Sequence, residues 1–202
     1  MARTIGSNGK TTRAAIRAKS LALFAESSFA AVSMRRIADE VGVQPAALYA
    51  YYPSKQSILV DLLVSHMEEL LAAWEEEKCA ESPGDALERF SRFHIRYHIK
   101  RADAVFLSYM ELRALEPEGF KEIEALRKTY EGELRAILEA GQASGEFAVK
   151  DPPIAAMAIL AMLTGVNTWY RSKGRLSQAA IADRYVAMVK GAAGASVEAA
   201  HV

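Results

Sequence analysis

The sequence is poor in cysteine and in long apolar runs. Its 202 residues include one cysteine, Cys79, which cannot form an internal disulfide and so favours a reducing compartment. No apolar run reaches the roughly 18 to 20 residues that span a bilayer, and the first residues lack the apolar segment of a secretory signal. From the sequence alone we expect a soluble, cytoplasmic protein without a membrane partner.

Net charge is also absent from the chain as a whole, because 25 Lys and Arg balance 25 Asp and Glu. Their distribution is uneven. Residues 1–60 hold eight basic side chains against three acidic ones, so this segment carries +5 and residues 61–202 carry −5. A basic segment joined to an acidic one suits a protein in which only one end neutralises phosphates. Arg3 and Lys10 lie in the polar stretch at the start, which is expected either to be available to DNA or to be a chain end without a role.

Alternating strand patterns and internal repeats are missing, whereas apolar residues recur at helical spacing along most of the chain. The composition is 51% hydrophobic, which is enough for a substantial core. The sequence therefore predicts an all-α fold. Helices are expected over residues 12–27, 54–78, 85–100, 103–115, 117–143, 153–170 and 177–191, with a linker-like break at Ser82-Pro83-Gly84.

Residues 33–52 predict two short helices separated by a sharp turn, a helix-turn-helix at about 34–51. Ser33 is a good N-cap, and Gly42 supplies the positive φ that such a turn needs. Pro45 suits the first turn of the second helix, because its missing N–H would be unpaired there anyway. Leu48 then closes a small core. We interpret this stretch as the DNA-reading element.

The outer side of the second helix would enter the major groove, where base edges are distinguishable. Gln44 is suited to pairing with adenine, and two alanines are suited to contacting thymine methyl groups. Tyr49, Tyr51 and Lys55 are expected to hold phosphates, because a hydroxyl or ammonium at a helix end positions the protein without reading sequence. Tyr52 is expected in the core. The candidate DNA-binding residues are Ser33, Arg35, Arg36, Gln44, Ala46, Ala47, Tyr49, Tyr51 and Lys55.

Several of these positions occur together in a known pattern. Residues 16–55 resemble the N-terminal domain of TetR-family transcriptional regulators through Leu23-Phe24, Ile37-Ala38, Gly42-Val43, Leu48-Tyr49, Tyr51-Tyr52 and Lys55. The chain departs from that pattern at four places. Ser28 stands where glycine is usual, Gln44 where a Ser or Thr cap is usual, Tyr52 where Phe is usual, and Lys19-Ser20 where two alanines are common.

The resemblance implies an all-helical homodimer, as in a repressor. Its two DNA-binding domains, which we call the heads, read a palindromic operator, and a bound ligand releases the DNA. The resemblance also implies a DNA-binding domain over residues 1–53 and a ligand-binding and dimerisation domain over 54–202, with 54–78 as connector helix. One head alone buries too little protein surface against DNA to reach the affinity of specific operator binding. We expect the dimer to form through helices 153–170 and 177–191, where Ala158, Ala161 and Gly165 allow close approach.

The second part of the chain is rich in aromatic residues, which suit an apolar effector pocket but equally suit an ordinary core. The candidate ligand-binding residues are Phe90, Phe93, Tyr97, Phe106, Tyr109, Tyr130 and Trp169. The pattern Trp169-Tyr170-Arg171, Gly174-Arg175-Leu176-Ser177 and Ile181-Ala182-Asp183 resembles a TetR subgroup linked to lipid, sterol or acyl-CoA catabolism. That resemblance implies an acyl-CoA-like effector. Arg96, Arg171, Lys173 and Arg175 are suited to contacting CoA phosphates, but equally suit solvated helix ends.

Other functions are weighed against this interpretation. A DNA-binding protein without small-molecule regulation stays open. A helical enzyme is disfavoured, because the sequence shows no nucleophile–base pattern, phosphate loop or metal constellation. His94 and His98 lie one helical turn apart, but no carboxylate precedes either by three residues and no third ligand is evident. We therefore expect neither a metal nor a cofactor.

Overall fold

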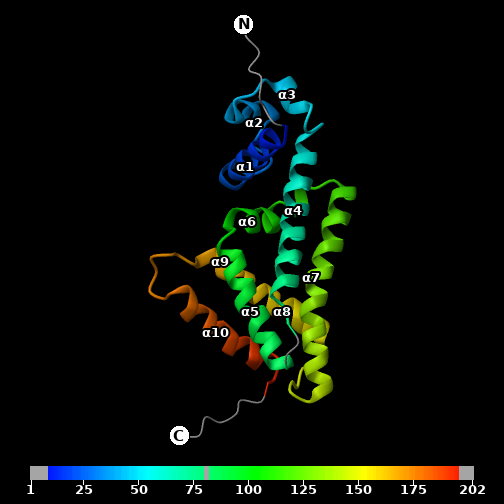
Figure 1. The fold of residues 1–202 in the computed structure, drawn as a ribbon, viewed down its shortest axis with the longest axis vertical. Coiled ribbons are helices and arrows are strands. Elements are labelled where there is room, and N and C mark those ends of the chain that lie inside the picture. Colours follow the sequence, from blue (N-terminus) through cyan, green and yellow to red (C-terminus); the bar gives the residue numbers. More distant parts are fainter. Residues whose placement is uncertain (1–8, 80–81, 196–202) are drawn as a thin grey trace. The chain divides into compact units, whose positions relative to one another are not determined.

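The computed structural model describes residues 9–79 and 82–195, and these residues contain helices and no strands (Figure 1). The all-α fold class predicted from periodicity is confirmed. The chain divides into two compact units, and α4 and α7 contribute to both. Unit 1 comprises residues 1–67 and 103–124, and unit 2 comprises residues 68–102 and 125–202. The candidate tail residue Arg3 lies outside the described residues.

Unit 1 is built on the first helices of the chain. It holds α1 (Gly9–Ser27), α2 (Met34–Val41), α3 (Pro45–Tyr49) and the beginning of α4 (Lys55–Glu77). It also holds α6 (Ala102–Met110), apart from its first residue, the short η1 (Leu112–Ala114) and the beginning of α7 (Pro117–Ser144). Its core includes Ile16, Phe24, Ile37, Leu48 and Leu107, none of which exposes measurable surface. The helical periodicity of the sequence therefore buries the faces it predicts.

Unit 2 contains the rest of the helices. These are α5 (Pro83–Ile99), α8 (Pro152–Thr164), α9 (Val166–Trp169), α10 (Gln178–Ala192) and the later parts of α4 and α7. α5 packs against both α8 and α10. Three of these helices begin at capping side chains, since Ser82, Asp151 and Ser177 each accept a backbone N–H from the first turn. Local sequence thus fixes where they start.

The apolar stretch predicted over residues 153–170 is interrupted at Gly165, so that α8 ends at Thr164 and α9 forms a separate turn. By length and composition alone, Pro152–Trp169 is long and apolar enough to cross a membrane, and 33% of it is buried. The expectation that no run is long enough is therefore corrected. Core helices of soluble proteins share this length and composition, so this stretch is weak evidence for a membrane span.

Candidate DNA-binding surface and ligand site

The helix-turn-helix has the local structure that its capping residues predict. The hydroxyl of Ser33 accepts the N–H of Arg36 at 3.1 Å, which caps α2. Gly42 ends α2 with φ of 78° and ψ of 33°, in the left-handed region, and its N–H donates to the carbonyls of Ala38 and Asp39. A side chain would strain this turn, which explains why glycine is used. The caps inferred from the sequence are confirmed.

The second helix of the motif, α3, is short and turns one side outward. Pro45 occupies its first turn, and Leu48 is fully buried beneath it. Gln44 is the N-cap residue by position, yet its side chain makes no capping hydrogen bond. Gln44, Ala46 and Ala47 are exposed, and the Tyr49 side chain is 52% exposed. The amide of Gln44 is thus available to an external donor and acceptor, as base recognition requires.

The remaining candidates surround this helix. Arg35 and Arg36 lie exposed in the first turn of α2, next to the exposed cap Ser33, and Tyr51 is half-buried. Cations exposed at the surface of a reading motif suit phosphate contacts. All of these residues belong to unit 1, so one compact unit carries them.

Lys55 needs a different interpretation. Its ammonium donates to the carbonyls of Phe29 and Val32, each at 2.7 Å, and to that of Ala30 at 3.4 Å. It also lies 4.3 Å from the centre of the Phe29 ring. An ammonium has three donors, and all three are directed into the loop between α1 and α2. Lys55 therefore has a structural role within unit 1, which competes with the phosphate contact expected from the sequence.

A charged network that the sequence interpretation missed fastens α1 to α4. The Tyr52 hydroxyl donates to Asp61 Oδ2 at 2.6 Å, and Arg13 donates to the Tyr52 hydroxyl and to Asp61, each at 3.2 Å. Arg17 lies 3.6 Å from the same carboxylate. Burial, followed by the hydrogen bond to Asp61, raises the pKa of Tyr52. Tyr52 is 2% exposed, as expected for a core residue.

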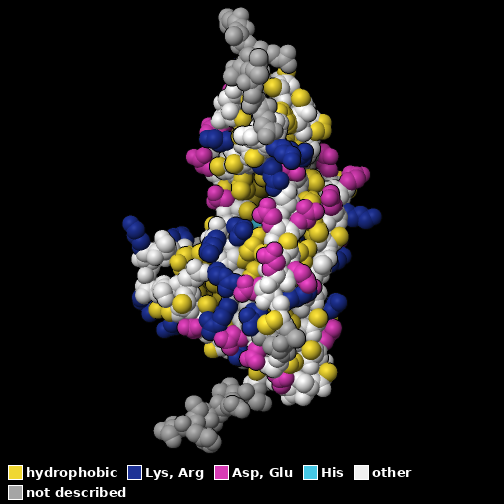
Figure 2. Space-filling view, in the orientation of Figure 1, with side chains coloured by type: hydrophobic (Ala, Val, Ile, Leu, Met, Phe, Trp, Pro, Cys, Tyr) yellow, Lys and Arg dark blue, Asp and Glu magenta, His cyan; other side chains and the backbone are white. Residues whose placement is uncertain are grey.

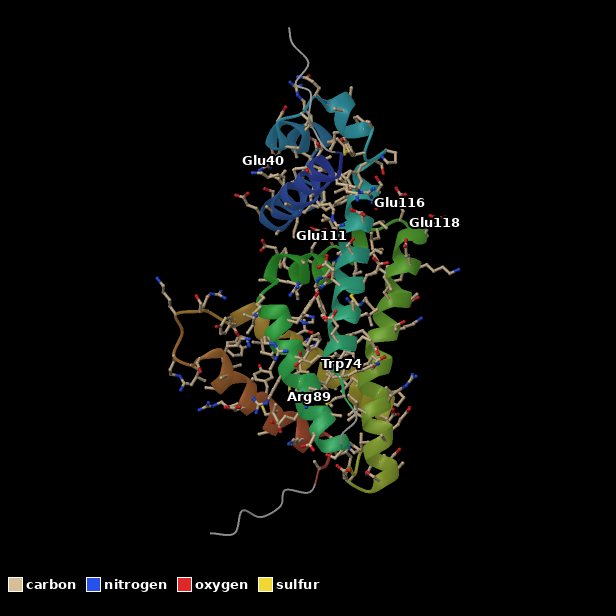
Figure 3. The ribbon with its side chains drawn as sticks, viewed as in Figure 1. Glu40, Trp74, Arg89, Glu111, Glu116 and Glu118 are labelled. Atoms are coloured by element: carbon tan, nitrogen blue, oxygen red, sulfur yellow. The ribbon has the colours of Figure 1, made fainter. Side chains whose placement is uncertain are left out.

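Four of the seven candidate ligand residues come together in unit 2. Phe90, Phe93, Tyr97 and Tyr130 are all buried. Phe90 lies 5.2 Å from Tyr130 and Phe93 lies 5.5 Å from Tyr97, measured between ring centres. Trp74 of α4, labelled in Figure 3, contacts Phe90 at 5.0 Å and Phe93 at 5.3 Å. We call these five residues the aromatic cluster; Trp74 was missed because it lies outside the aromatic-rich sequence segments.

The other three candidates are partly exposed. Trp169 is 48% exposed and stacks on Tyr185 of α10, with ring centres 6.3 Å apart. Phe106 and Tyr109 are 46% and 43% exposed on α6, in unit 1. Within unit 2, Trp169 is therefore a half-exposed residue stacked on α10, whereas the aromatic cluster is buried.

The histidine pair borders the aromatic cluster. His94 and His98 are 1% and 4% exposed, and their rings stack with centres 3.7 Å apart. His94 Nδ1 lies 3.1 Å from the Tyr130 hydroxyl, and its Nε2 lies 2.9 Å from the Thr164 hydroxyl. His98 Nδ1 donates to the carbonyl of His94 at 2.8 Å. Both ring nitrogens of His94 are thus used by neighbouring protein groups.

A groove of about 540 Å³ opens at the edge of the aromatic cluster. Trp74 lines it from α4, and Lys78 and Glu133 lie at its polar side, joined by an ion pair of 3.2 Å. Its other walls are mostly small or apolar, formed by Cys79, Pro83, Ala86, Ala136, Ile137 and Ala140, with Glu75 also present. A concave apolar site with a few charged groups is suited to a small amphipathic molecule.

Exposed apolar side chains also gather on the C-terminal helices. Ile154 and Met157 of α8 are 59% and 50% exposed, and Met188 of α10 is 47% exposed. Ala158 and Ala161 lie exposed on α8. The segment that joins α9 and α10 exposes Arg171, Lys173 and Arg175, and Figure 2 shows basic side chains over it. Arg96, another residue considered for a CoA phosphate, pairs with Glu77 at 2.8 Å.

A short helix that follows a glycine turn and exposes its outer side, with helices throughout the rest of the described residues, is the arrangement found in helix-turn-helix DNA-binding proteins. Two family models match. Residues 16–62 match "Bacterial regulatory proteins, tetR family", and residues 80–192, more than half of the chain, match "Tetracyclin repressor-like, C-terminal domain". The chain therefore belongs to the TetR family of DNA-binding transcriptional regulators. Family and fold are those of regulators, which are generally not enzymes.

Solved structures agree with this assignment. A TetR-family regulatory protein from Rhodococcus RHA1 is 28% identical with a TM-score of 0.87, over 92% of this chain and 98% of that one. The regulator PfmR from Thermus thermophilus is 31% identical with a TM-score of 0.78, over 86% and 96%. AibR, solved in complex with isovaleryl coenzyme A and operator DNA, shares the fold at 23% identity with a TM-score of 0.78, over 92% and 99%.

A search among curated proteins gave no match.

Proposed function

We propose that this protein is a ligand-responsive repressor that binds a palindromic operator as a homodimer and releases it when a small hydrophobic or acyl-CoA-type effector binds. The observation that carries the DNA-binding part is the exposed α3, whose N-terminal Gln44 has no capping bond. Gln44, Ala46 and Ala47 would contact base edges. Ser33, Arg35, Arg36, Tyr49 and Tyr51 would contact phosphates or neighbouring bases.

The proposed dimer uses the exposed apolar side chains of α8 and α10. Ile154, Met157 and Met188 are large apolar residues that water would otherwise solvate, and burying them against a second copy is favourable. Exposed Ala158 and Ala161 would let two α8 helices approach closely. Two heads related by a two-fold axis read two half-sites, which is why the operator would be an inverted repeat.

The proposed effector site is the aromatic cluster, entered through the groove beside Trp74. A bound effector would repack Phe90 and Phe93, which contact the Trp74 ring. An acyl-CoA-type molecule is supported by the C-terminal sequence resemblance and by AibR, whose solved complex contains isovaleryl coenzyme A. The exposed cations Arg171, Lys173 and Arg175 offer partners for phosphate groups.

The proposed release step operates through α4, the connector helix. This one continuous helix carries Trp74 near its end and Lys55 at its start. Repacking at Trp74 would shift α4, and the paired heads would then no longer match successive major grooves. A ligand-bound crystal structure in which the separation of the two heads is unchanged would contradict this step. The cytoplasm, where the DNA lies, is the proposed location.

The effector part is tested with purified protein and a panel of CoA thioesters, beginning with isovaleryl-CoA. A true effector should raise the melting temperature and release operator DNA at the same concentration. Ala136→Trp should fill the groove and abolish both responses, whereas Ala125→Trp, on the same helix but outside the groove, should retain them. A panel in which nothing shifts the melting temperature, or binding without DNA release, would count against ligand-responsive repression by this class of effector.

A further inference from the structure

Residues 28–32 form the loop between α1 and α2. Ser33, the N-cap of α2, follows this loop directly, so the position of the loop sets the position of the start of α2. Two backbone bonds hold the loop locally, from Ser28 N–H to the Phe24 carbonyl at 3.0 Å and from Val32 N–H to the Phe29 carbonyl at 3.4 Å. Its carbonyls are held by Lys55, as described above, and the N–H of Phe29 donates to Glu111 Oε1 at 3.0 Å. Glu111 lies 82 residues from Phe29 in the sequence, between α6 and η1, and is labelled in Figure 3.

Glu111 is itself held in place from two sides. One turn before it, Leu107 of α6 is fully buried in the core of unit 1. After it, the Ala114 carbonyl of η1 accepts a hydrogen bond of 2.5 Å from the side-chain amide of Gln56, and Glu116 N–H donates to the same amide group at 3.4 Å. A carboxylate on a segment anchored at both ends is preorganised to accept the Phe29 N–H.

The loop leaves few other ways to satisfy this N–H. Phe29 is 7% exposed, and its ring packs edge-on against Phe24 with centres 5.3 Å apart. Ser28 beside it has φ of 67°, so the chain turns sharply here. A backbone N–H in such a place needs a fixed acceptor. With that acceptor removed, the loop would lose its bond to Glu111. It would keep the Lys55 bonds and the two backbone bonds, from Ser28 N–H to the Phe24 carbonyl and from Val32 N–H to the Phe29 carbonyl.

We propose that Glu111 is a positioning residue for operator recognition: by accepting the Phe29 N–H, it fixes the loop that sets α2 and, through the Gly42 turn, the reading helix α3. The α6–η1 segment is then a functional part of the DNA-binding head, although it lies far from it in the sequence. The inference rests on the proposed reading surface. Glu111 itself does not contact DNA. Its effect is on the placement of the residues that do.

The test compares Glu111→Ala, which removes the acceptor, with Glu111→Gln, which removes the charge but keeps a side-chain carbonyl oxygen. Glu122→Ala, an exposed glutamate of α7 in the same unit, controls for loss of one negative charge. Affinity is measured for a duplex that the wild-type protein selects from a random-sequence pool and for an unrelated duplex of equal length. Exchange of the Phe29 amide, followed by NMR, reports the bond itself.

Glu111→Ala should bind the selected duplex about tenfold more weakly, the loss expected from one hydrogen bond to a charged group, and the unrelated duplex equally well. Its Phe29 amide should exchange faster. Glu111→Gln and Glu122→Ala should stay within about twofold of wild type. Selective loss on one duplex requires misplacement, because a partly unfolded protein loses both together.

Three results would overturn the inference. They are faster Phe29 exchange with unchanged affinity, equal loss on both duplexes, and a loss in Glu111→Gln as large as in Glu111→Ala. If Glu111→Ala does not fold, Glu111→Asp, whose shorter side chain withdraws the acceptor, is measured in the same way. A wild-type protein that selects no sequence contradicts the proposed reading surface and this inference with it; unimpaired Glu111→Ala contradicts the inference alone.

Discussion

The hydroxyl of Tyr52 donates a 2.6 Å hydrogen bond to the carboxylate of Asp61. Tyr52 follows the reading helix and Asp61 lies on α4, so the bond ties the end of the helix-turn-helix to the connector. Arg13 and Arg17 of α1 approach the same carboxylate. The phenylalanine that is usual at this position in the family pattern has no hydroxyl and cannot make this bond.

Tyr52→Phe should lower the free energy of unfolding by about 1–2 kcal/mol, because it removes a donor from a partly buried carboxylate. Urea unfolding of the two proteins measures the difference. Tyr51→Phe removes the hydroxyl of a half-buried neighbour and serves as the control. It should change the free energy of unfolding by less than about 0.5 kcal/mol. Equal stability of Tyr52→Phe and wild type would show that the network adds nothing to the fold.

Ser28→Gly should stabilise the protein. Ser28 has φ of 67°, a left-handed conformation that costs a residue with a side chain about 1 kcal/mol more than glycine. We expect a gain of about 0.5–1 kcal/mol, part of which is offset by the greater freedom of glycine in the unfolded chain. Ala30→Gly, in the same loop without positive φ, should give no gain. A loss of stability in Ser28→Gly would contradict this explanation.

Ser20→Ala should also stabilise the protein, by about 1 kcal/mol, because a buried hydroxyl without a hydrogen-bond partner is costly. Ser20 is fully buried on α1, and its hydroxyl oxygen has no partner. Lys19→Ala breaks only an exposed 3.0 Å pair with Glu40 and should be neutral within about 0.5 kcal/mol. Thermal unfolding of both variants provides the comparison. A lower melting temperature for Ser20→Ala than for wild type would contradict this prediction.

The junction of α5 and α10 should weaken in acid. The Glu88 carboxylate accepts hydrogen bonds from Lys190 at 2.7 Å and Arg92 at 2.9 Å, and these partners hold the pKa of Glu88 below its usual value. A carboxyl with a lowered folded pKa stabilises the fold above its unfolded pKa, about 4.3, and loses that contribution as pH falls through the folded value.

Glu88→Gln therefore removes this contribution at neutral pH. The stability difference from wild type should be below about 1 kcal/mol, since the pair is partly exposed, and constant from about pH 6 to 8. It should shrink below about pH 4. Asp183→Asn, at the outer end of the same network, is 61% exposed and should differ less from wild type. A difference that grows in acid would contradict the assigned direction.

The features that the sequence predicted are mostly local ones. The caps at Ser33 and Gly42, the proline start of α3 and the burial of Leu48 depend on neighbouring residues, and the spacing of residue types was enough to infer them. The interrupted helix near Gly165 was less predictable, because the apolar pattern continues through the break.

What could not be predicted depends on contacts between distant segments. The sequence places Lys55 at a helix start, where it is equally suited to a phosphate, and only the folded loop brings three carbonyls to its ammonium. Trp74 joins the aromatic cluster because α4 and α5 pack together in unit 2. Glu111 reaches Phe29 from 82 residues away, and no local pattern signals such a bond.

The central claim, that α3 reads an operator through Gln44, is tested most directly by selecting duplexes from a random pool with wild-type protein and with Gln44→Ala. Wild type should select an inverted repeat. Gln44→Ala should keep the repeat, its stability and its salt dependence, but lose preference at one symmetric position by about 1–3 kcal/mol. Selection of the same sequence by both proteins, or of no inverted repeat by wild type, would contradict the account.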